Sequence, residues 1–127
     1  MKFHDYHLES YKVSNRGEKI EFNLVYGYPG EETDDSQITF EGVALYHFIN
    51  SQGTIITDIE VVPLKDFILS MEEELAEWNR MYGVKYWQSD IATYIEKLKA
   101  MELRVWEITS AIGFYGFVIA KGVSASA

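Results

Sequence analysis

The hydrophobic pattern of this chain changes its period at Pro63, and no other feature constrains the fold as strongly. Before Pro63, apolar residues alternate with polar ones, as at Ile20, Phe22 and Leu24. Such alternation is typical of strands with one buried face. After Pro63, apolar residues recur every three or four positions, which indicates amphipathic helices. An order of strands first and helices second favours an α+β fold over alternating α/β units.

Four strands are expected before Pro63, at residues 3–13, 19–28, 37–49 and 54–62. Segments rich in Gly, Asn, Asp and Ser separate them and predict turns at residues 14–17, 29–36 and 50–53. The first two strands are expected to pair as a hairpin, and all four to form an antiparallel meander. Residues 37–49 are apolar at both parities, which predicts a central strand covered on both faces.

Two helices are expected after Pro63. The first extends from Leu64 to Tyr82 and ends at Gly83, because glycine readily adopts the left-handed conformation at a helix C-terminus. Ser89 is expected to cap the second helix, whose apolar stripe covers residues 91–101. Each helix therefore has one face suited to packing on the sheet.

Two further strands are expected at residues 103–109 and 114–121, joined as a hairpin around residues 110–113. The predicted order is ββββ-αα-ββ, a mostly antiparallel sheet with two helices packed on it. Residues 1–122 are expected to form this single domain. Residues 123–127, with the sequence Val-Ser-Ala-Ser-Ala, are expected to be a frayed terminal tail.

Negative charge is concentrated in the middle of the chain. The net charge is −9, and residues 31–82 carry twelve acidic and two basic residues. This balance argues against nucleic acid as a partner, because phosphate binding requires a basic patch. A basic protein or a cation is compatible with the sign of the charge, and acidity that serves solubility alone is the alternative.

Several classes of chemistry have no motif in this sequence. It contains no cysteine, no phosphate-binding glycine loop, no nucleophile elbow and no H-E-x-x-H zinc motif. We therefore expect no cofactor and no bound metal, and favour a protein that is not an enzyme. The first residues lack the apolar stretch of a signal peptide, and the longest uncharged run is too short to span a bilayer. A cytoplasmic location without membrane contact is expected.

Two groups of acidic residues are candidates for partner binding. The first lies on the outer side of the first helix and comprises Glu72, Glu73, Glu74 and Glu77. Within it, Glu73 and Glu77 are four residues apart, and a like-charge pair at this spacing costs about 0.2–0.5 kcal/mol. The second group is Asp58 and Glu60, on one face of the fourth strand. A merely solvated surface is the alternative interpretation of both groups.

A pocket is the second kind of candidate site. Among the His and Asp side chains of His4-Asp5-Tyr6-His7, strand geometry places only Asp5 and His7 on the same side. His47 is the third histidine, and Trp78 and Trp87 lie near the connection between the helices. Asp5, His7, His47, Trp78 and Trp87 therefore define an alternative hypothesis, a small enzyme or ligand-binding domain with an aromatic-walled pocket. Structural roles and core packing are the competing interpretation of these residues.

Short motifs in the first half of the chain carry a resemblance. In order they are Phe3-His4-Asp5 followed by Leu8, Gly17-Glu18-Lys19-Ile20-Glu21-Phe22, Ile38-Thr39-Phe40-Glu41-Gly42-Val43, and Ile55-Ile56-Thr57-Asp58-Ile59-Glu60. This series resembles a class of small bacterial proteins in which an N-terminal His-Asp precedes a β-meander and an I-x-F-x-x-V strand. Some of them are similar to immunity proteins of bacterial toxin systems. The resemblance implies a partner-binding role and carries over no catalytic residue.

The function expected from the sequence is thus non-catalytic protein binding. An immunity-type protein that neutralises a basic bacterial toxin through its acidic face is the leading hypothesis. A homodimer that buries surplus aromatic residues is a further alternative.

Overall fold

A computed structural model describes the backbone of residues 2–26 and 34–126, and the side chains of residues 6–26, 35–49, 55, 56, 58–110 and 113–126. The elements in chain order are β1 (Lys2–Ser14), the 3-10 turn η1 (Asn15–Gly17), β2 (Lys19–Tyr26), β3 (Asp34–Glu41), β4 (Leu45–Val62), α1 (Leu64–Ser70), α2 (Glu72–Tyr82), α3 (Ile91–Ala100), β5 (Arg104–Ala120) and β6 (Gly122–Ser126). The strands form one antiparallel sheet of order β5-β4-β1-β2-β3-β6. The predicted α+β class with a mostly antiparallel sheet is confirmed.

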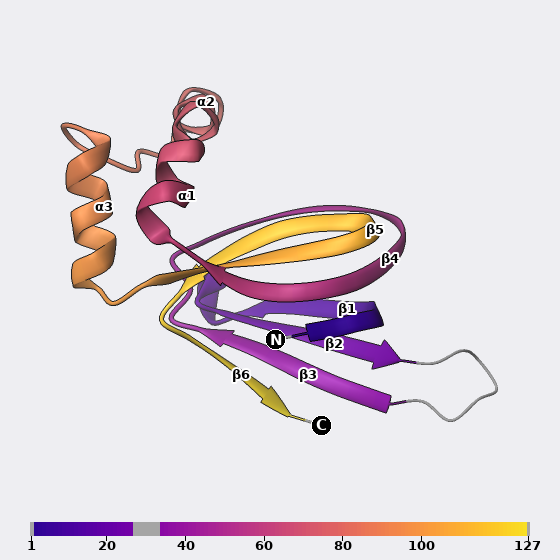
Figure 1. Cartoon of the computed structure of the whole chain (residues 1–127). Coiled ribbons are helices and arrows are strands. Elements are labelled where there is room, and N and C mark those ends of the chain that lie inside the picture. The colour runs from indigo at the N-terminus through magenta and orange to yellow at the C-terminus, as the bar shows by residue number, and fades with distance from the viewer. Residues whose placement is uncertain (1, 27–33, 127) are drawn as a thin grey trace.

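The molecule has three layers (Figure 1). Strands β1, β2, β3 and β6 form one layer. Strands β4 and β5 are paired along most of their length, and this two-stranded ribbon turns back on itself over the first layer. The three helices gather at one end of the ribbon and leave its other end uncovered.

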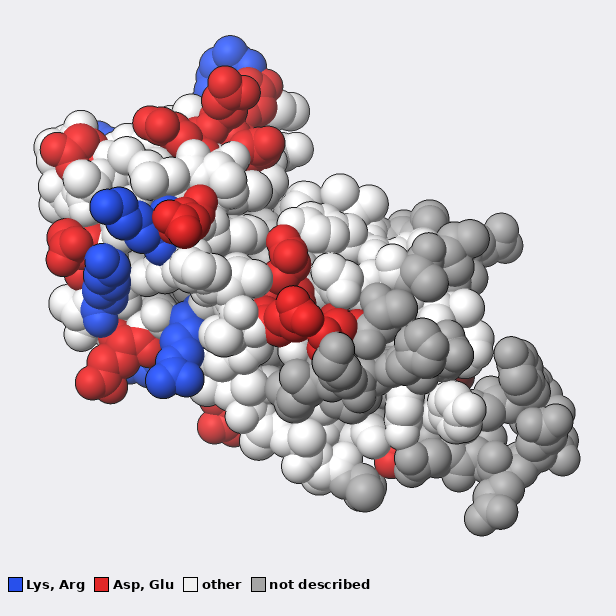
Figure 2. Space-filling view, in the orientation of Figure 1, with Lys and Arg blue, Asp and Glu red and all other residues white. Residues whose placement is uncertain are grey.

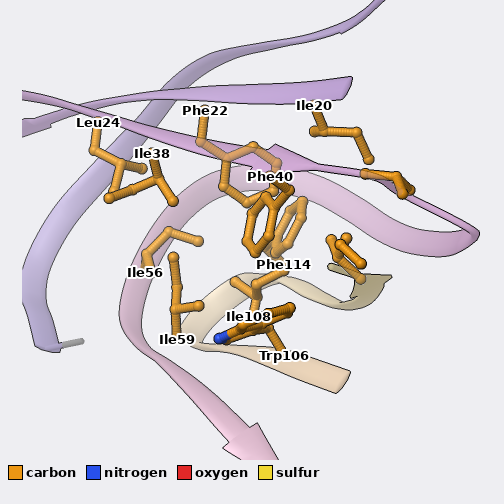
Figure 3. Packing of buried hydrophobic residues seen from close by; sticks show 13 residues of the cluster. Ile20, Phe22, Leu24, Ile38, Phe40, Ile56, Ile59, Trp106, Ile108 and Phe114 are labelled. Carbon is orange, nitrogen blue, oxygen red and sulfur yellow. The ribbon is translucent and has the colours of Figure 1, made fainter. Parts of the chain in front are cut away.

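A first hydrophobic core fills the space between the ribbon and the layer beneath it. Ile20, Phe22 and Leu24 of β2 are fully buried and face buried side chains of β4 and β5 (Figure 3). The Phe22 ring makes edge-on contacts with Phe40 and Phe114, at centroid distances of 5.6 and 6.1 Å. Such contacts add about 0.5–1.5 kcal/mol per pair to the gain from burial. The alternation of β2 predicted from the sequence is therefore confirmed.

The predicted hairpin between the first two strands is also confirmed. Its turn contains three consecutive residues with positive φ, which are Asn15, Arg16 and Gly17. Asn and Gly tolerate this conformation better than other residues. On β1 the register shifts by one residue between Leu8 and Ser10. Because a one-residue bulge reverses the parity of the strand, residues on both sides of it can face the same core.

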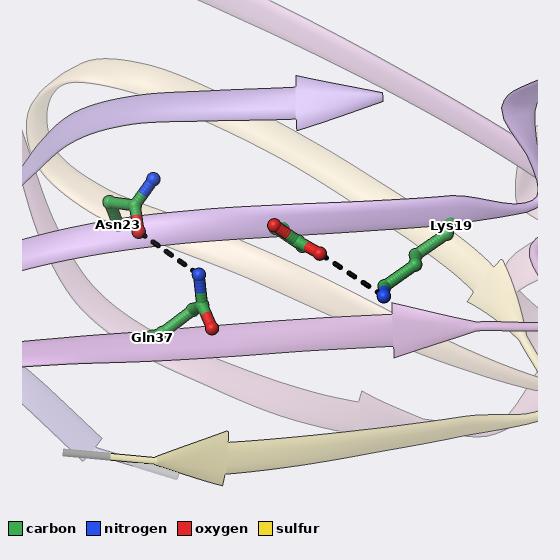
Figure 4. A network of polar contacts seen from close by, with 4 residues as sticks. Lys19, Asn23 and Gln37 are labelled. Carbon is green, nitrogen blue, oxygen red and sulfur yellow. Dashed lines mark hydrogen bonds and ion pairs between the residues drawn. The ribbon is translucent and has the colours of Figure 1, made fainter. Parts of the chain in front are cut away.

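The outer face of the β2–β3 pair is polar (Figure 4). Lys19 forms an ion pair with Glu21 at 3.2 Å, and the Gln37 side-chain amide donates to the Asn23 carbonyl oxygen at 3.3 Å. Glu21 and Asn23 thus point away from the core, as their parity predicts. The two faces of β2 differ because one packs against the ribbon and the other meets solvent.

A second hydrophobic core joins the helices to the ribbon. Phe67 and Ile68 of α1, Leu75 of α2 and Leu98 of α3 are buried, together with residues of β5 that point away from the first core. The predicted apolar stripes therefore do face the sheet. Gly83 ends α2 with a φ of 71°, which confirms the predicted stop.

The helical region differs from the sequence prediction in two respects. The expected helix from Leu64 to Tyr82 is two helices, α1 and α2, which meet at Met71. At this break the Phe67 carbonyl accepts two hydrogen bonds, from the Ser70 hydroxyl at 2.6 Å and from the Met71 N–H at 3.1 Å. The N-cap of α3 is Asp90 rather than Ser89, since the Asp90 carboxylate accepts from the Thr93 N–H at 2.7 Å.

The strand predictions need more correction. The expected strand at residues 37–49 is divided between β3 and β4, and Gly42, with a φ of 64°, lies in the break. The expected turns at residues 50–53 and 110–113 lie inside β4 and β5. There the paired strands bend together, with register shifts instead of a chain reversal. The meander is also interrupted, because β4 pairs with β1 and not with β3.

Two segments that were expected to be irregular contain strand residues. Residues 34–36 of the expected acidic loop belong to β3, whereas residues 29–33 lie outside the described part of the chain. Residues 123–126, expected to be frayed, belong to β6 and pair with β3 in regular register. The backbone hydrogen bonds of this pairing are the physical reason that the tail is held.

The close approach of β4 and β5 at Gly116 provides a test of this packing. A Cβ added at Gly116 would lie 2.5 Å from Cδ1 of Phe48 and 2.7 Å from the backbone oxygen of His47. We expect Gly116→Ala to lower the free energy of unfolding by about 1–3 kcal/mol, measured by urea denaturation. Gly122→Ala is the matched control, because a Cβ there meets no atom within 4 Å. Equal stability of the two variants would contradict the ribbon packing.

Candidate interaction surface

The outer face of the ribbon changes character where the helices end. Val62 and Val105 are register partners that pack in the second core beneath the helices. Two residues further along each strand on the same face, Glu60 lies directly opposite Glu107. Glu60 is exposed and Glu107 half-buried. The same face is thus apolar under the helices and acidic beyond them.

The bend of the ribbon divides it into two arms, and the second arm, with residues 45–49 of β4 and 115–119 of β5, also changes from buried to exposed along its outer face. Phe117 is buried in the second core, whereas the next residue on its face, Tyr115, is 42% exposed. Its register partner Ile49 is 58% exposed. The Tyr115 hydroxyl donates to Oε2 of Glu107 at 2.8 Å and so links the two arms on this face. We name Ile49, Glu60, Glu107 and Tyr115 the ribbon patch.

Asp58 does not belong to this surface. It was expected to bind a partner together with Glu60, but it is only 9% exposed. Its Oδ1 accepts a hydrogen bond from the Ile59 backbone N–H at 2.8 Å, beside two register shifts of β4. A carboxylate held in this way satisfies the irregular backbone locally. Asp58 is therefore removed from the candidate partner-binding residues.

The acidic residues of α2 are exposed, as expected, but their position in the helix differs from the prediction. Because the helix breaks at Met71, Glu72, Glu73 and Glu74 occupy the first turn of α2. Negative side chains at a helix N-terminus interact favourably with the helix dipole. Glu77 forms an ion pair with Arg80. Figure 2 shows acidic side chains gathered over α2 and in a second group over the middle of the molecule.

The residues of the predicted pocket are only partly brought together. The rings of His47 and Trp78 lie 4.7 Å apart. The Trp87 ring instead packs against the Tyr94 ring at a centroid distance of 6.0 Å, and Trp87 lines a cavity whose lining does not include Trp78 or His47. His7 lies on β1 between Tyr6 and Leu8, which pack on the first core, so it points to the opposite face. The Asp5 side chain lies outside the described residues.

No metal site is found among the side chains that the structure describes, where no group of three or more His, Asp or Glu could hold an ion. None of the helices in the described ranges is long and apolar enough to cross a membrane. Comparison with known proteins adds no assignment. No protein-family model matches the chain, and no curated protein matches it significantly.

Sequence reasoning identified Glu60 but missed the rest of the ribbon patch. Glu107 and Tyr115 were expected on the two strands of one hairpin, and Ile49 on a strand with no predicted contact to either of them. The sequence signal for this patch was weak. It consisted of one acidic residue, Glu107, in a mostly apolar strand and of the alternation that places Tyr115 opposite its buried neighbours. The register of β4 against β5 and the bend of the ribbon bring these residues together.

A titration tests the contact between the two arms. Removal from water, together with the hydrogen bond and the charge of Glu107, raises the pKa of Tyr115 from 10.0 to about 12. We expect Glu107→Gln to lower the Tyr115 pKa, because the negative charge is lost. The phenolate absorbance of Tyr115 is obtained by difference from Tyr115→Phe.

The sign of the accompanying stability change follows from linkage. A raised pKa means that the folded state holds the proton more tightly than the unfolded state. The stabilisation is therefore complete below pH 10 and is lost as the pH rises towards about 12. Ionisation of Tyr115 near its ordinary pKa in the wild-type protein would contradict the contact.

Proposed function

We propose that this protein is a non-catalytic binding domain that recognises a basic surface of another protein. The exposed first turn of α2 supplies one acidic group, and Glu60 and Glu107 supply a second. Clustered Lys or Arg side chains of a partner would be attracted to both groups. Such complementarity accelerates encounter and weakens with salt.

The observation that carries this proposal is the combination of charge and exposed apolar surface in the ribbon patch. Ile49 and Tyr115 are register partners that remain 58% and 42% exposed beside two carboxylates. Solubility explains exposed acids, but it does not explain an exposed Ile–Tyr pair among them. Protein interfaces commonly combine apolar or tyrosine anchors with a polar rim. The ribbon patch has this composition.

The class of partner is suggested by the resemblance of the N-terminal half to small bacterial proteins of immunity type. In that role the domain neutralises a basic bacterial toxin in the cytoplasm by covering its functional surface. A carboxylate such as that of Glu60 can accept two hydrogen bonds from one Arg guanidinium, and this geometry favours partner surfaces rich in Arg. The domain would act by occupancy and would need no cofactor.

The enzyme alternative has less support. It requires a shared cavity with Trp78 and Trp87 as walls and with histidines and acids around it, namely Asp5, His7, His47, Asp58 and Glu60. Trp87 lines a cavity formed by α2 and residues 85–89, and His47 contacts Trp78 on a different part of α2. The acids of the ribbon patch and the aromatic walls therefore do not form one concave site in the described structure.

The test compares two charge-matched double variants. Glu60→Gln/Glu107→Gln changes the ribbon patch, and Glu9→Gln/Glu18→Gln removes the same charge at exposed positions of another region. A protein that co-purifies from native cells is identified, purified and titrated against each variant at about 50 and 500 mM NaCl. We expect about tenfold weaker binding for the ribbon-patch variant and for high salt, and little change for the control.

Three outcomes would overturn the proposal. Equal weakening by both double variants would mean that only net charge matters. Binding without salt dependence would exclude electrostatic recognition. Recovery of no partner, together with a solution mass of two chains, would instead indicate a homodimer that buries the ribbon patch.

A further inference from the structure

A cavity between α2 and the segment that leads into α3 is separate from the ribbon patch. Its volume is about 290 Å³. Leu75 of α2 is 1% exposed and provides an apolar floor, and the small side chain of Ala76 leaves the space open. Tyr86 and Trp87 line it from the opposite segment. Ligand pockets begin at roughly this volume, so the cavity suits a small molecule.

The aromatic side chains that line this cavity pack against a buried ring of α3. The ring centroids of Tyr86 and Trp87 lie 6.2 and 6.0 Å from the ring centroid of Tyr94, a buried residue of α3. Burial raises the pKa of Tyr86, which agrees with a ring partly removed from water. Asp90 anchors the same segment through its N-cap bond to Thr93. Rings supported in this way are pre-organised, and binding a flat ligand against them costs little ordering of side chains.

The polar groups around the cavity can all donate hydrogen bonds, and one of them is positively charged. The amides of Asn79 and Gln88 and the hydroxyl of Ser89 line it, together with Lys85. Lys85 is the one charged side chain among the described lining residues, although the protein as a whole carries a net charge of −9. A cation beside amide donors and an aromatic wall selects a ligand that is both flat and anionic.

We propose that this cavity binds a small aromatic carboxylate, with its ring against Trp87 and its carboxylate at Lys85. The Asn79 and Gln88 amides complete the hydrogen bonding of the carboxylate oxygens. The proposal does not depend on the binding of a basic protein at the ribbon patch. It adds a second site, for a ligand of opposite charge to that partner.

Glu72 offers an internal check on the electrostatics. It precedes Ala76 by four residues on α2, so helical spacing places it on the same face, one turn from the cavity. Its negative charge opposes an anionic ligand. Glu72→Gln is therefore expected to strengthen carboxylate binding, whereas Lys85→Gln weakens it.

The experiment uses benzoate and its neutral analogue benzamide as probes of the full chain. Binding is followed by amide chemical-shift changes in isotope-labelled protein. We expect benzoate to bind with a dissociation constant below about 1 mM and to shift residues 75–79 and 85–89. Lys85→Gln should weaken it about tenfold, and Lys97→Gln, an exposed lysine of α3, is the matched control.

A cavity-filling variant separates binding in the cavity from binding at the surface. Ala76→Leu places a larger side chain in the cavity at a helix position where both residues are favourable, and it should abolish the shifts. Its spectrum without ligand reports whether the fold is retained. Equal affinity for benzoate and benzamide, unchanged binding by Ala76→Leu, or shifts scattered over the molecule would each overturn the proposal.

Discussion

Burial of both faces of β5 is the constraint on which the rest of this structure depends. Trp106, Ile108 and Phe114 point into the first core, and Val105 and Phe117 point into the second. Successive side chains of a strand point to opposite faces, so one strand can serve two cores at once. The helices dock on the same strand that closes the core of the sheet. Without β5, the first core would lose Trp106, Ile108 and Phe114, and the helices would lose the strand on which they dock.

The candidate interaction surface is a consequence of this arrangement. The ribbon is longer than the helices that cover it, so its outer face continues beyond their edge (Figure 1). Half-buried Val62 and buried Val105 give way there to Glu60 and Glu107. Exposed Ile49 and Tyr115 on the other arm show that the transition is not purely polar. The ribbon patch therefore combines acidic and apolar side chains beside the helices, and this composition suits the proposed binding of a basic protein surface.

The parts of the fold that sequence reasoning predicted are those set by neighbouring residues. The alternation of Ile20, Phe22 and Leu24, the left-handed turn at Asn15–Gly17 and the stop at Gly83 all follow from local sterics and burial. Errors arose where local composition has two structural solutions. Residues 50–53 have the composition of a turn, yet a bend shared by two paired strands suits the same residues. The break at Met71 likewise lies beside a Ser70 hydroxyl bond that a continuous helix also tolerates.

The sequence by itself determined the α+β class, the first hairpin, the apolar helix faces and the acidic character of the middle of the chain. The tertiary structure alone decided that β4 pairs with β1, that β6 pairs with β3, that Asp58 is buried and that Glu107 meets Tyr115. Periodicity and turn propensity act between residues close in the chain, and they can be read from it. Strand register and partner choice are settled by which distant apolar faces bury each other best, and that balance exists only in the folded molecule.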